Sequence, residues 1–216
     1  MANEVTAGLE SERKYDVPEG TELPDFAALG FTARTVRFVL AAAYYDTVDG
    51  VLATNRMTLR RREGGHDAGW HLKTPGGPEG RVEHQVALAD EFPDELRAVV
   101  ADLLGDRAVI EVARLNTDRT AITLMDEGGA EVAEIADDRV VGTDTRAGAE
   151  RRWREWEAEL LDGAPAPARE REELLNRLEA LLLAAGAVPS PSSSKLARAT
   201  GRAPLPAFGE PSDSVE

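Results

Sequence analysis

The stretch Glu10-Ser11-Glu12-Arg13-Lys14 places two carboxylates and an ammonium at alternate positions near the N-terminus. On a β-strand, alternate side chains project from one face, so Glu10, Glu12 and Lys14 would all point in the same direction. On a protein surface this is the pattern of a charged edge strand. Inside a walled site, the two carboxylates would repel each other unless a cation lay between them. The stretch therefore indicates either a solvated edge strand or a metal site. Whether other strands repeat the same charged pattern distinguishes these two interpretations.

Strand patterns dominate the chain as far as residue 161, and glycine-rich turns of the kind that joins antiparallel strands separate them. The patterns predict strands over 9–17, 34–46, 57–62, 69–74, 81–88, 109–125, 130–141 and 150–161. Eight strands joined mostly by short hairpins are typical of a closed or nearly closed antiparallel barrel. We therefore predict a mainly β fold (α+β), an eight-stranded antiparallel β-barrel.

Helix signals are few, and they carry apolar stripes. Helices are predicted over 92–105 and 168–185, with a short helical turn over 24–29. The last residues, 201–216, contain prolines and show no periodicity, so we expect a disordered tail or linker there. The sequence thus predicts one domain over 1–200, with a few helices packed outside the barrel.

Almost every predicted strand has one ionised face and one mostly apolar face. The ionised faces are Arg60/Arg62, His71/Lys73, Arg81/Glu83/Gln85, Glu134/Asp138 and Glu155/Glu157/Glu159. A small barrel normally has apolar residues inside and polar residues outside, and alternation alone allows that arrangement. The ionised faces hold both signs of charge, however, and the striped helices would cover an apolar outer wall. We therefore predict the inverse arrangement, in which charged side chains line the interior.

A charged interior of this composition has a definite chemistry. Arginine and lysine side chains neutralise phosphate oxygens, and arginine offers a planar, permanently charged fork. Carboxylates are hard oxygen ligands suited to Mg²⁺ or Mn²⁺. The basic set is Lys14, Arg60, Arg62, Lys73, Arg81 and Arg119, and the acidic set is Glu10, Glu12, Glu83, Glu134, Asp138, Glu157 and Glu159. A pore that holds both sets fits a linear polyphosphate with bound metal.

Bulk composition narrows the class of protein. The chain has 216 residues and a net charge of −15, which argues against a nonspecific nucleic-acid binder. Its apolar stretches are too short to span a membrane, and its N-terminus lacks the pattern of a secretory signal. Cysteine is absent from the sequence, so disulfides and thiolate metal sites are excluded. We expect a cytoplasmic protein that binds neither nucleic acid nor membrane.

The ordered series of motifs resembles the CYTH domain family, the triphosphate tunnel metalloenzymes that include class IV adenylate cyclase and thiamine triphosphatase. The resemblance spans roughly residues 8 to 200. It rests first on Glu10-x-Glu12-x-Lys14, followed in order by Tyr45-Asp46-Thr47, Leu59-Arg60-x-Arg62, Trp70-x-Leu72-Lys73, Arg81-x-Glu83, Arg119-Thr120, Glu134-x-x-x-Asp138, Glu157-x-Glu159-Leu160 and Ser194-Lys195.

The resemblance implies an eight-stranded tunnel that binds a triphosphate and Mg²⁺ or Mn²⁺. It implies phosphate contacts from Lys14, Arg60, Arg62, Lys73, Arg81, Arg119 and Lys195. It implies metal ligands Glu10, Glu12, Glu157 and Glu159, with Glu83, Glu134 and Asp138 nearby, and a catalytic set of Glu10, Glu12 and Lys14. One departure is Gln85, which stands where relatives often carry a third acid, so the local charge available to metal is lower.

The sequence leaves three functions open. The first is hydrolysis of inorganic tripolyphosphate to pyrophosphate and phosphate, with thiamine and nucleoside triphosphates as related substrates. The second is class IV adenylate cyclase, which needs a base pocket that the sequence does not indicate. The third is a noncatalytic polyphosphate- or nucleotide-binding module that precedes a CHAD domain, as CYTH domains often do. The intact acid set favours the hydrolase, and the sequence indicates no oligomeric state.

Overall fold

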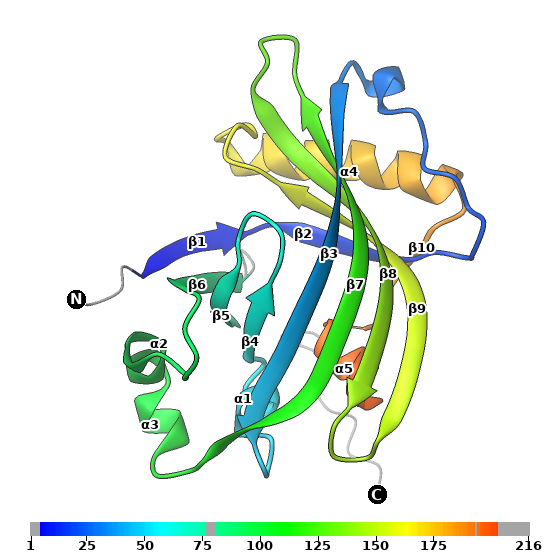
Figure 1. Ribbon diagram of the computed structural model, residues 1–216. Coiled ribbons are helices and arrows are strands. Elements are labelled where there is room, and N and C mark those ends of the chain that lie inside the picture. Colours follow the sequence, from blue (N-terminus) through cyan, green and yellow to red (C-terminus); the bar gives the residue numbers. More distant parts are fainter. Residues whose placement is uncertain (1–4, 77–80, 193, 203–216) are drawn as a thin grey trace, which may run out of the picture.

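The structure is a computed structural model that describes residues 5–76, 81–192 and 194–202, without the side chains of Leu9 and Glu10. Within these residues, ten strands form one antiparallel sheet in the order β1-β6-β5-β4-β3-β7-β8-β9-β2-β10 (Figure 1). The strands are β1 (Thr6–Glu10), β2 (Glu12–Asp16), β3 (Thr32–Thr47), β4 (Thr58–Glu63), β5 (Gly69–Pro75), β6 (Arg81–Ala87), β7 (Val109–Met125), β8 (Glu131–Asp144), β9 (Ala149–Leu160) and β10 (Val188–Pro189).

The N-terminal segment closes this sheet into a tunnel. β1 pairs with β6, whereas β2, which begins after the single residue Ser11, pairs with β9. β6 and β9 are the two outer strands of the series β6-β5-β4-β3-β7-β8-β9. Because β1 and β2 are consecutive in the chain, their pairing with these two strands connects the two edges of the series. The predicted single strand over 9–17 was therefore wrong, because the chain changes its partner at Ser11.

The rest of the predicted barrel is confirmed. With β1 and β2 counted as one strand, the eight predicted strands are present, with ends within three residues of those predicted. The two-residue strand β10 was not predicted, because so short a segment carries no alternation. Most of the glycine-rich turn between the strands predicted over 69–74 and 81–88, and most of the predicted tail at 201–216, lie outside the described residues.

The helices differ more from expectation than the strands. They are η1 (Phe26–Leu29), α1 (Val51–Thr54), α2 (Asp94–Val99), α3 (Ala101–Leu104), α4 (Ala168–Ala184) and α5 (Lys195–Thr200). The predicted helix over 92–105 is two helices, since Val100 has φ −117 and ψ 14 and interrupts the helix. The helix over 168–185 is confirmed as α4, and the turn over 24–29 as η1. α1 and α5 are too short to produce a periodic signal.

Two separate groups of helices cover the outside of the tunnel. α4 buries Leu174, Leu178 and Leu182 against Ile135 and Trp156, which belong to the apolar strand faces. α2 and α3 cover the outer faces of β4 to β6 in a separate apolar cluster, made of Leu52, Leu59, Trp70, Leu72, Val86, Leu96, Val100 and Leu104. Because the apolar faces are the ones that the helices cover, the ionised faces point inward, as predicted.

α5 is the exception, because it packs on the inner face of the sheet (Figure 1). Its Leu196 and Ala199 belong to an apolar cluster with Tyr44, Leu115 and Trp153. Trp153 lies two residues before Glu155 on β9, so it is on the same inner face as the ionised residues of that strand. A Cβ added to Gly142 would lie 3.0 Å from the Ala199 Cβ and from the Trp153 ring. The bare backbone of Gly142 is thus what lets α5 approach the sheet.

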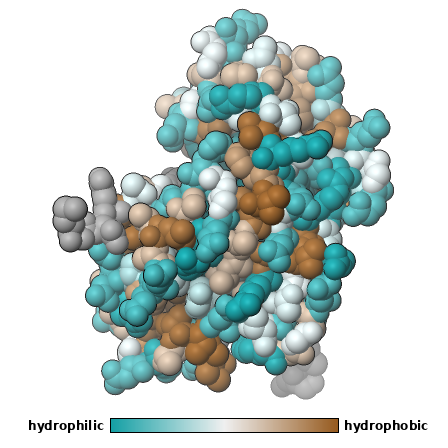
Figure 2. All heavy atoms as spheres, in the orientation of Figure 1, coloured by the Kyte–Doolittle hydropathy of each residue, from teal (hydrophilic) through white to brown (hydrophobic). Residues whose placement is uncertain are grey.

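Polar residues cover most of the face shown in Figure 2, and apolar residues form separate patches on it. This distribution agrees with the net charge of −15. In the described part of the chain, none of the helices has the length and apolar character needed to cross a membrane.

The contact between α4 and the sheet predicts a stability difference within one helix. Leu178→Ala is expected to lower the free energy of unfolding by about 2–5 kcal/mol, because Leu178 is fully buried and truncation leaves a cavity. Leu183→Ala, at a side chain that is 37% exposed on the same helix, is expected to cost less than about 1 kcal/mol. Urea denaturation measures both, and equal losses would contradict the described packing of α4.

Candidate functional site

The interior of the tunnel holds a cavity of about 210 Å³ to which every strand from β2 to β9 contributes a side chain. Of the residues predicted to form a site, those that line it are Glu12, Lys14, Arg60, Arg62, Lys73, Arg81, Glu83, Arg119, Glu134, Glu157, Glu159 and Lys195. Asp138 is buried behind Arg119 and does not line the cavity. Glu10 pairs through its backbone with Arg81, and its side chain lies outside the described residues.

Strands β4 to β6 supply a basic wall made of Arg60, Arg62, Lys73 and Arg81. Arg62 is 6% exposed and forms an ion pair with Asp67, yet its buried Nε has no hydrogen-bond partner in the described part of the chain. Burial, with the positive charges of Arg60 and Arg119, lowers the pKa of Arg62 to about 9. Burial and two neighbouring cations therefore both disfavour the charged form of Arg62.

Strands β2, β8 and β9 supply an acidic wall whose register follows from the strand pairing. Glu12 lies opposite Glu159 across β2 and β9, and Glu159 lies opposite Glu134 across β9 and β8. Directly opposite residues have Cβ atoms about 4.5–5.5 Å apart, so like charges there are destabilising. Burial raises the pKa of Glu134, and the carboxylates of Asp138 and Glu157 raise it further against the opposing charge of Arg119. This row of three carboxylates favours a cation between them.

Cations already lie beside part of the acidic wall. The Lys14 Nζ lies 3.0 Å from a Glu12 carboxylate oxygen and also contacts Glu157. Burial disfavours the Glu12 carboxylate, but Lys14 and Lys73 outweigh it and lower the pKa of Glu12 to about 2. Glu12 is therefore ionised at neutral pH and available to a metal ion.

Arg119 forms a bidentate ion pair at the edge of the cavity. Its Nε and Nη2 donate to the two Asp138 carboxylate oxygens at 2.8 and 2.7 Å, and Nη2 also donates to Glu157 at 2.8 Å. Although burial disfavours the charged forms, these contacts raise the pKa of Arg119 and help to lower that of Glu157. Such bidentate, charge-assisted bonds fix the guanidinium firmly in place.

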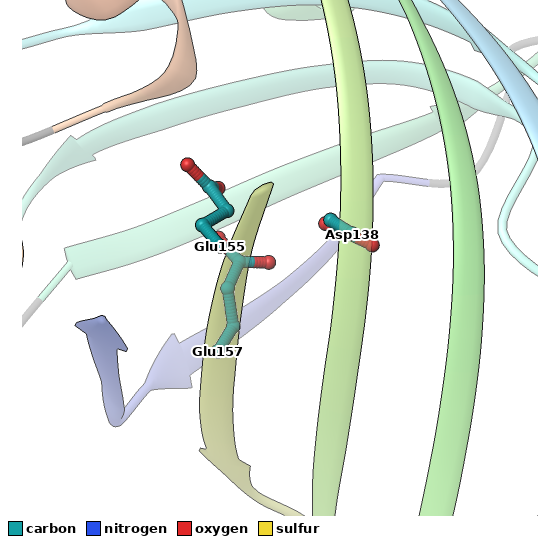
Figure 3. Close-up of side chains that lie close together, drawn as sticks. All are labelled: Asp138, Glu155 and Glu157. Atoms are coloured by element: carbon teal, nitrogen blue, oxygen red, sulfur yellow. The ribbon is translucent and has the colours of Figure 1, made fainter. Parts of the chain in front are cut away.

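Asp138, Glu155 and Glu157 form a buried cluster in which one oxygen of each lies within 4.8 Å of the others (Figure 3). The Lys195 Nζ contacts all three carboxylates, at 3.0 Å from Asp138, 2.6 Å from Glu155 and 2.7 Å from Glu157. Burial disfavours the ammonium, but these carboxylates raise the pKa of Lys195. The spacing of the cluster would suit a metal ion, and the ammonium of Lys195 fills that position.

Several lining residues were not predicted. They are Phe38, Leu40, Tyr44, Thr58, Gly65, His66 and Asp67, together with Ser194, which was part of the Ser194-Lys195 motif but received no role. The residues of β3 alternate and share its inner face, a signal that strand periodicity offered. His66 and Asp67 lie in the turn after β4, where no periodicity applies. Glu155 was placed on an ionised face but received no role.

His71, which the sequence put on an ionised face, is fully buried in the lining of the cavity. Its Nδ1 lies 3.0 Å from a Glu83 carboxylate oxygen and its Nε2 lies 2.8 Å from the Asp67 carbonyl oxygen. Burial, with the nearby charge of Arg60, lowers the pKa of His71 to about 4 against the opposing hydrogen bond to Glu83. Through its contacts with Glu83 and Asp67, His71 connects β6 to the turn that carries Asp67.

A relative of this chain is found in Mycobacterium tuberculosis. A protein of Mycobacterium tuberculosis, uncharacterised and found in strains CDC 1551 / Oshkosh and H37Rv, is 42% identical over 211 residues. The match covers 89% of this chain and 40% of that protein, so the chain spans less than half the length of these relatives.

A solved structure shows the same fold. The crystal structure of a candidate adenylate cyclase from Bacillus halodurans has a TM-score of 0.58 and 21% identity, and the match covers 89% of this chain and 97% of that one. A candidate adenylyl cyclase from Hippeastrum, described as having a dominant triphosphatase activity, matches with a TM-score of 0.47 and 20% identity, over 92% and 98% of the two chains.

A family model gives the assignment directly. The model of the CYTH domain matches residues 8–187, which include all strands of the tunnel from β2 to β9. Lys195 and the rest of α5 lie beyond the matched residues. With the closed antiparallel sheet, the ionised interior and this match together, the chain belongs to the CYTH domain family.

Proposed function

We propose that the chain hydrolyses inorganic tripolyphosphate to pyrophosphate and phosphate with the help of Mg²⁺ or Mn²⁺. The observation that carries the proposal is the pairing of a basic and an acidic wall around one cavity, with the buried Nε of Arg62 left without a partner in the described residues. An anion at Arg62 would satisfy that group and offset the positive charge around it.

The size of the cavity favours a compact substrate. Its volume of about 210 Å³ is smaller than the roughly 300–1,000 Å³ of pockets that enclose drug-sized ligands. A bare chain of three phosphates needs no room for a base or a thiazole ring. The volume therefore supports tripolyphosphate over thiamine or nucleoside triphosphates, and over the cyclase reaction, which needs a base pocket.

The carboxylates of the acidic wall fit a divalent metal. We assign metal binding to Glu12, Glu157 and Glu159, with Glu10 as a further ligand and Glu83 and Glu134 nearby, since carboxylate oxygens are the ligands that Mg²⁺ and Mn²⁺ prefer. A metal ion bound there would offset phosphate charge and lower the pKa of a bound water. Asp138 is fully buried and does not line the cavity, so we assign it to the positioning of Arg119 and Lys195 instead.

The basic wall would hold the substrate. Arg60, Arg62, Lys73 and Arg81 would neutralise phosphate oxygens, and Lys14, Arg119 and Lys195 would do so from the acidic side. Charge spreads over the transferred phosphoryl group in the transition state, so fixed cations around it stabilise that state more than free water does. In this proposal the attacking group is water, and the protein supplies orientation and electrostatics.

Substrate choice is tested by measuring phosphate release from tripolyphosphate, ATP and thiamine triphosphate in parallel. Tripolyphosphate is expected to be the preferred substrate with Mg²⁺ or Mn²⁺, and metal removal by EDTA is expected to abolish release because the acidic wall then lacks its cation. A cyclic-AMP assay on the ATP samples tests the cyclase alternative.

Two results would contradict the proposal. If ATP is turned over faster than tripolyphosphate, or if cyclic AMP is produced, tripolyphosphate is not the preferred substrate. If none of the three compounds is hydrolysed and tripolyphosphate still raises the melting temperature, the chain is a binding module and not an enzyme.

The division of labour between the two walls is tested by a pair of variants. Glu12→Gln is expected to abolish turnover while leaving tripolyphosphate binding without metal largely intact, because Glu12 is assigned to metal. Arg62→Ala is expected to weaken metal-free binding by about 10- to 100-fold, since a charge-assisted hydrogen bond contributes about 1.5–3 kcal/mol. Isothermal titration calorimetry and steady-state kinetics measure the two effects.

Arg152→Ala is the matched control for the second variant. The Arg152 side chain is 71% exposed on β9 and pairs with Glu150, so its removal is expected to leave binding unchanged. Equal losses of metal-free binding in Glu12→Gln and Arg62→Ala would overturn the proposed division.

A further inference from the structure

Glu155 is a buried carboxylate to which the proposed reaction gives no role. It is 3% exposed and lies on β9, in line with Glu157 and Glu159. Its Oε2 accepts a hydrogen bond from Trp153 Nε1 at 2.6 Å, and its Oε1 lies 2.6 Å from the Lys195 Nζ. Both oxygens are thus directed at groups that hold α5 or belong to it.

Three carboxylates surround Lys195, and we call Asp138, Glu155 and Glu157 the lysine socket. The cations in contact with the socket at hydrogen-bonding distance, in the described residues, are Lys14, Arg119 and Lys195. Three positive charges therefore face the three negative charges of the socket; Lys14 is shared with Glu12, and a fourth cation, Arg198, lies 3.9 Å from the Glu155 Oε2. The socket is electrically balanced by side chains, so it does not need a metal ion to be stable.

Lys195 also connects the socket to α5, of which it is the first residue. Farther along this helix, Leu196 and Ala199 pack against the inner face of the sheet, and the Ala199 carbonyl accepts a hydrogen bond from Arg151 at 2.6 Å. The ammonium thus fixes the beginning of α5, while apolar packing and Arg151 fix its remainder. Loss of the ammonium contact would free the end of α5 that lines the cavity.

We propose that Glu155 is a positioning residue that holds the Lys195 ammonium in the socket, and that this ammonium prevents the three socket carboxylates from binding a divalent metal together. Metal is then confined to the carboxylates of the acidic wall, with Glu157 as the one residue that belongs to both groups. The inference rests on the proposed function through Glu157, which belongs both to the socket and to the assigned metal ligands. Beyond that function, the inference states that a carboxylate cluster with the spacing of a metal site binds the Lys195 ammonium and not a metal ion.

The number of bound metal ions tests this in the absence of any substrate. Mn²⁺ binding to the 216-residue chain is counted by electron paramagnetic resonance of free Mn²⁺ and by calorimetry. Lys195→Met is expected to bind one Mn²⁺ more than the wild type, because the socket loses one cation and keeps three carboxylates. Lys195→Arg retains the charge and is expected to keep the wild-type count.

A second substitution identifies where the additional ion binds. Glu155→Gln in the Lys195→Met background is expected to weaken the additional site by at least about tenfold, because it removes one charged ligand. Glu150→Gln in the same background is the matched control, since Glu150 lies on the same strand, is 50% exposed and pairs with Arg152. An unchanged Mn²⁺ count in Lys195→Met, or equal weakening by Glu150→Gln, would overturn the proposal.

The positioning of α5 is tested by hydrogen exchange. Glu155→Gln is expected to raise the exchange rate of the amides of 196–200 by about tenfold relative to Glu150→Gln, and equal rates would overturn the role of Glu155. If Glu155→Gln does not fold, the comparison of Lys195→Met with Lys195→Arg still decides whether the ammonium excludes metal. Because neither measurement involves hydrolysis, a failure of the proposed activity is recognised separately by the phosphate-release assay.

Discussion

The burial of charge inside the tunnel is the constraint on which the rest of this structure depends. A carboxylate or ammonium removed from water is costly unless an opposite charge and hydrogen bonds compensate it. Here the compensation is built from adjacent strands: Lys14 lies beside Glu157, and Arg119 binds Asp138 through two bonds. Because each pair joins two strands, an error in register would leave charges unpaired. Electrostatics thus specify the register of the sheet as well as the chemistry of its interior.

The charged interior moves the apolar packing to the outside. Instead of one central core, the described part of the chain has apolar clusters beneath α4, beneath α2 and α3, and around α5. The clusters beneath α4 and beneath α2 and α3 stabilise the tunnel from outside without occupying the cavity. The cluster around α5 lies inside, where Leu196 and Ala199 pack against apolar strand residues such as Leu115 and Trp153. A chain of ordinary hydrophobic content can therefore enclose a polar cavity.

Strand periodicity predicted much of this arrangement, and tertiary contacts account for the rest. Alternation placed Glu12, Arg62 and Glu157 on inward faces, and the structure brings all three to the cavity. The break at Ser11 could not be predicted, because the alternation continues through it and only the choice of partner changes. The socket was missed for a related reason: Glu155 was on the expected face, but its contact with Lys195 depends on a helix too short to leave a pattern.

The closure by β1 and β2 has a consequence for how the tunnel is made. The contact between Lys14 and Glu157 joins residues 143 positions apart in the chain. Contacts of such high order are slow to form, because the entropy of closing a long loop is lost before the contact is gained. During synthesis, β2 leaves the ribosome long before its partner β9 exists. Until then Glu12 and Lys14 remain in water, and the cavity acquires its low dielectric only when the last long strand arrives.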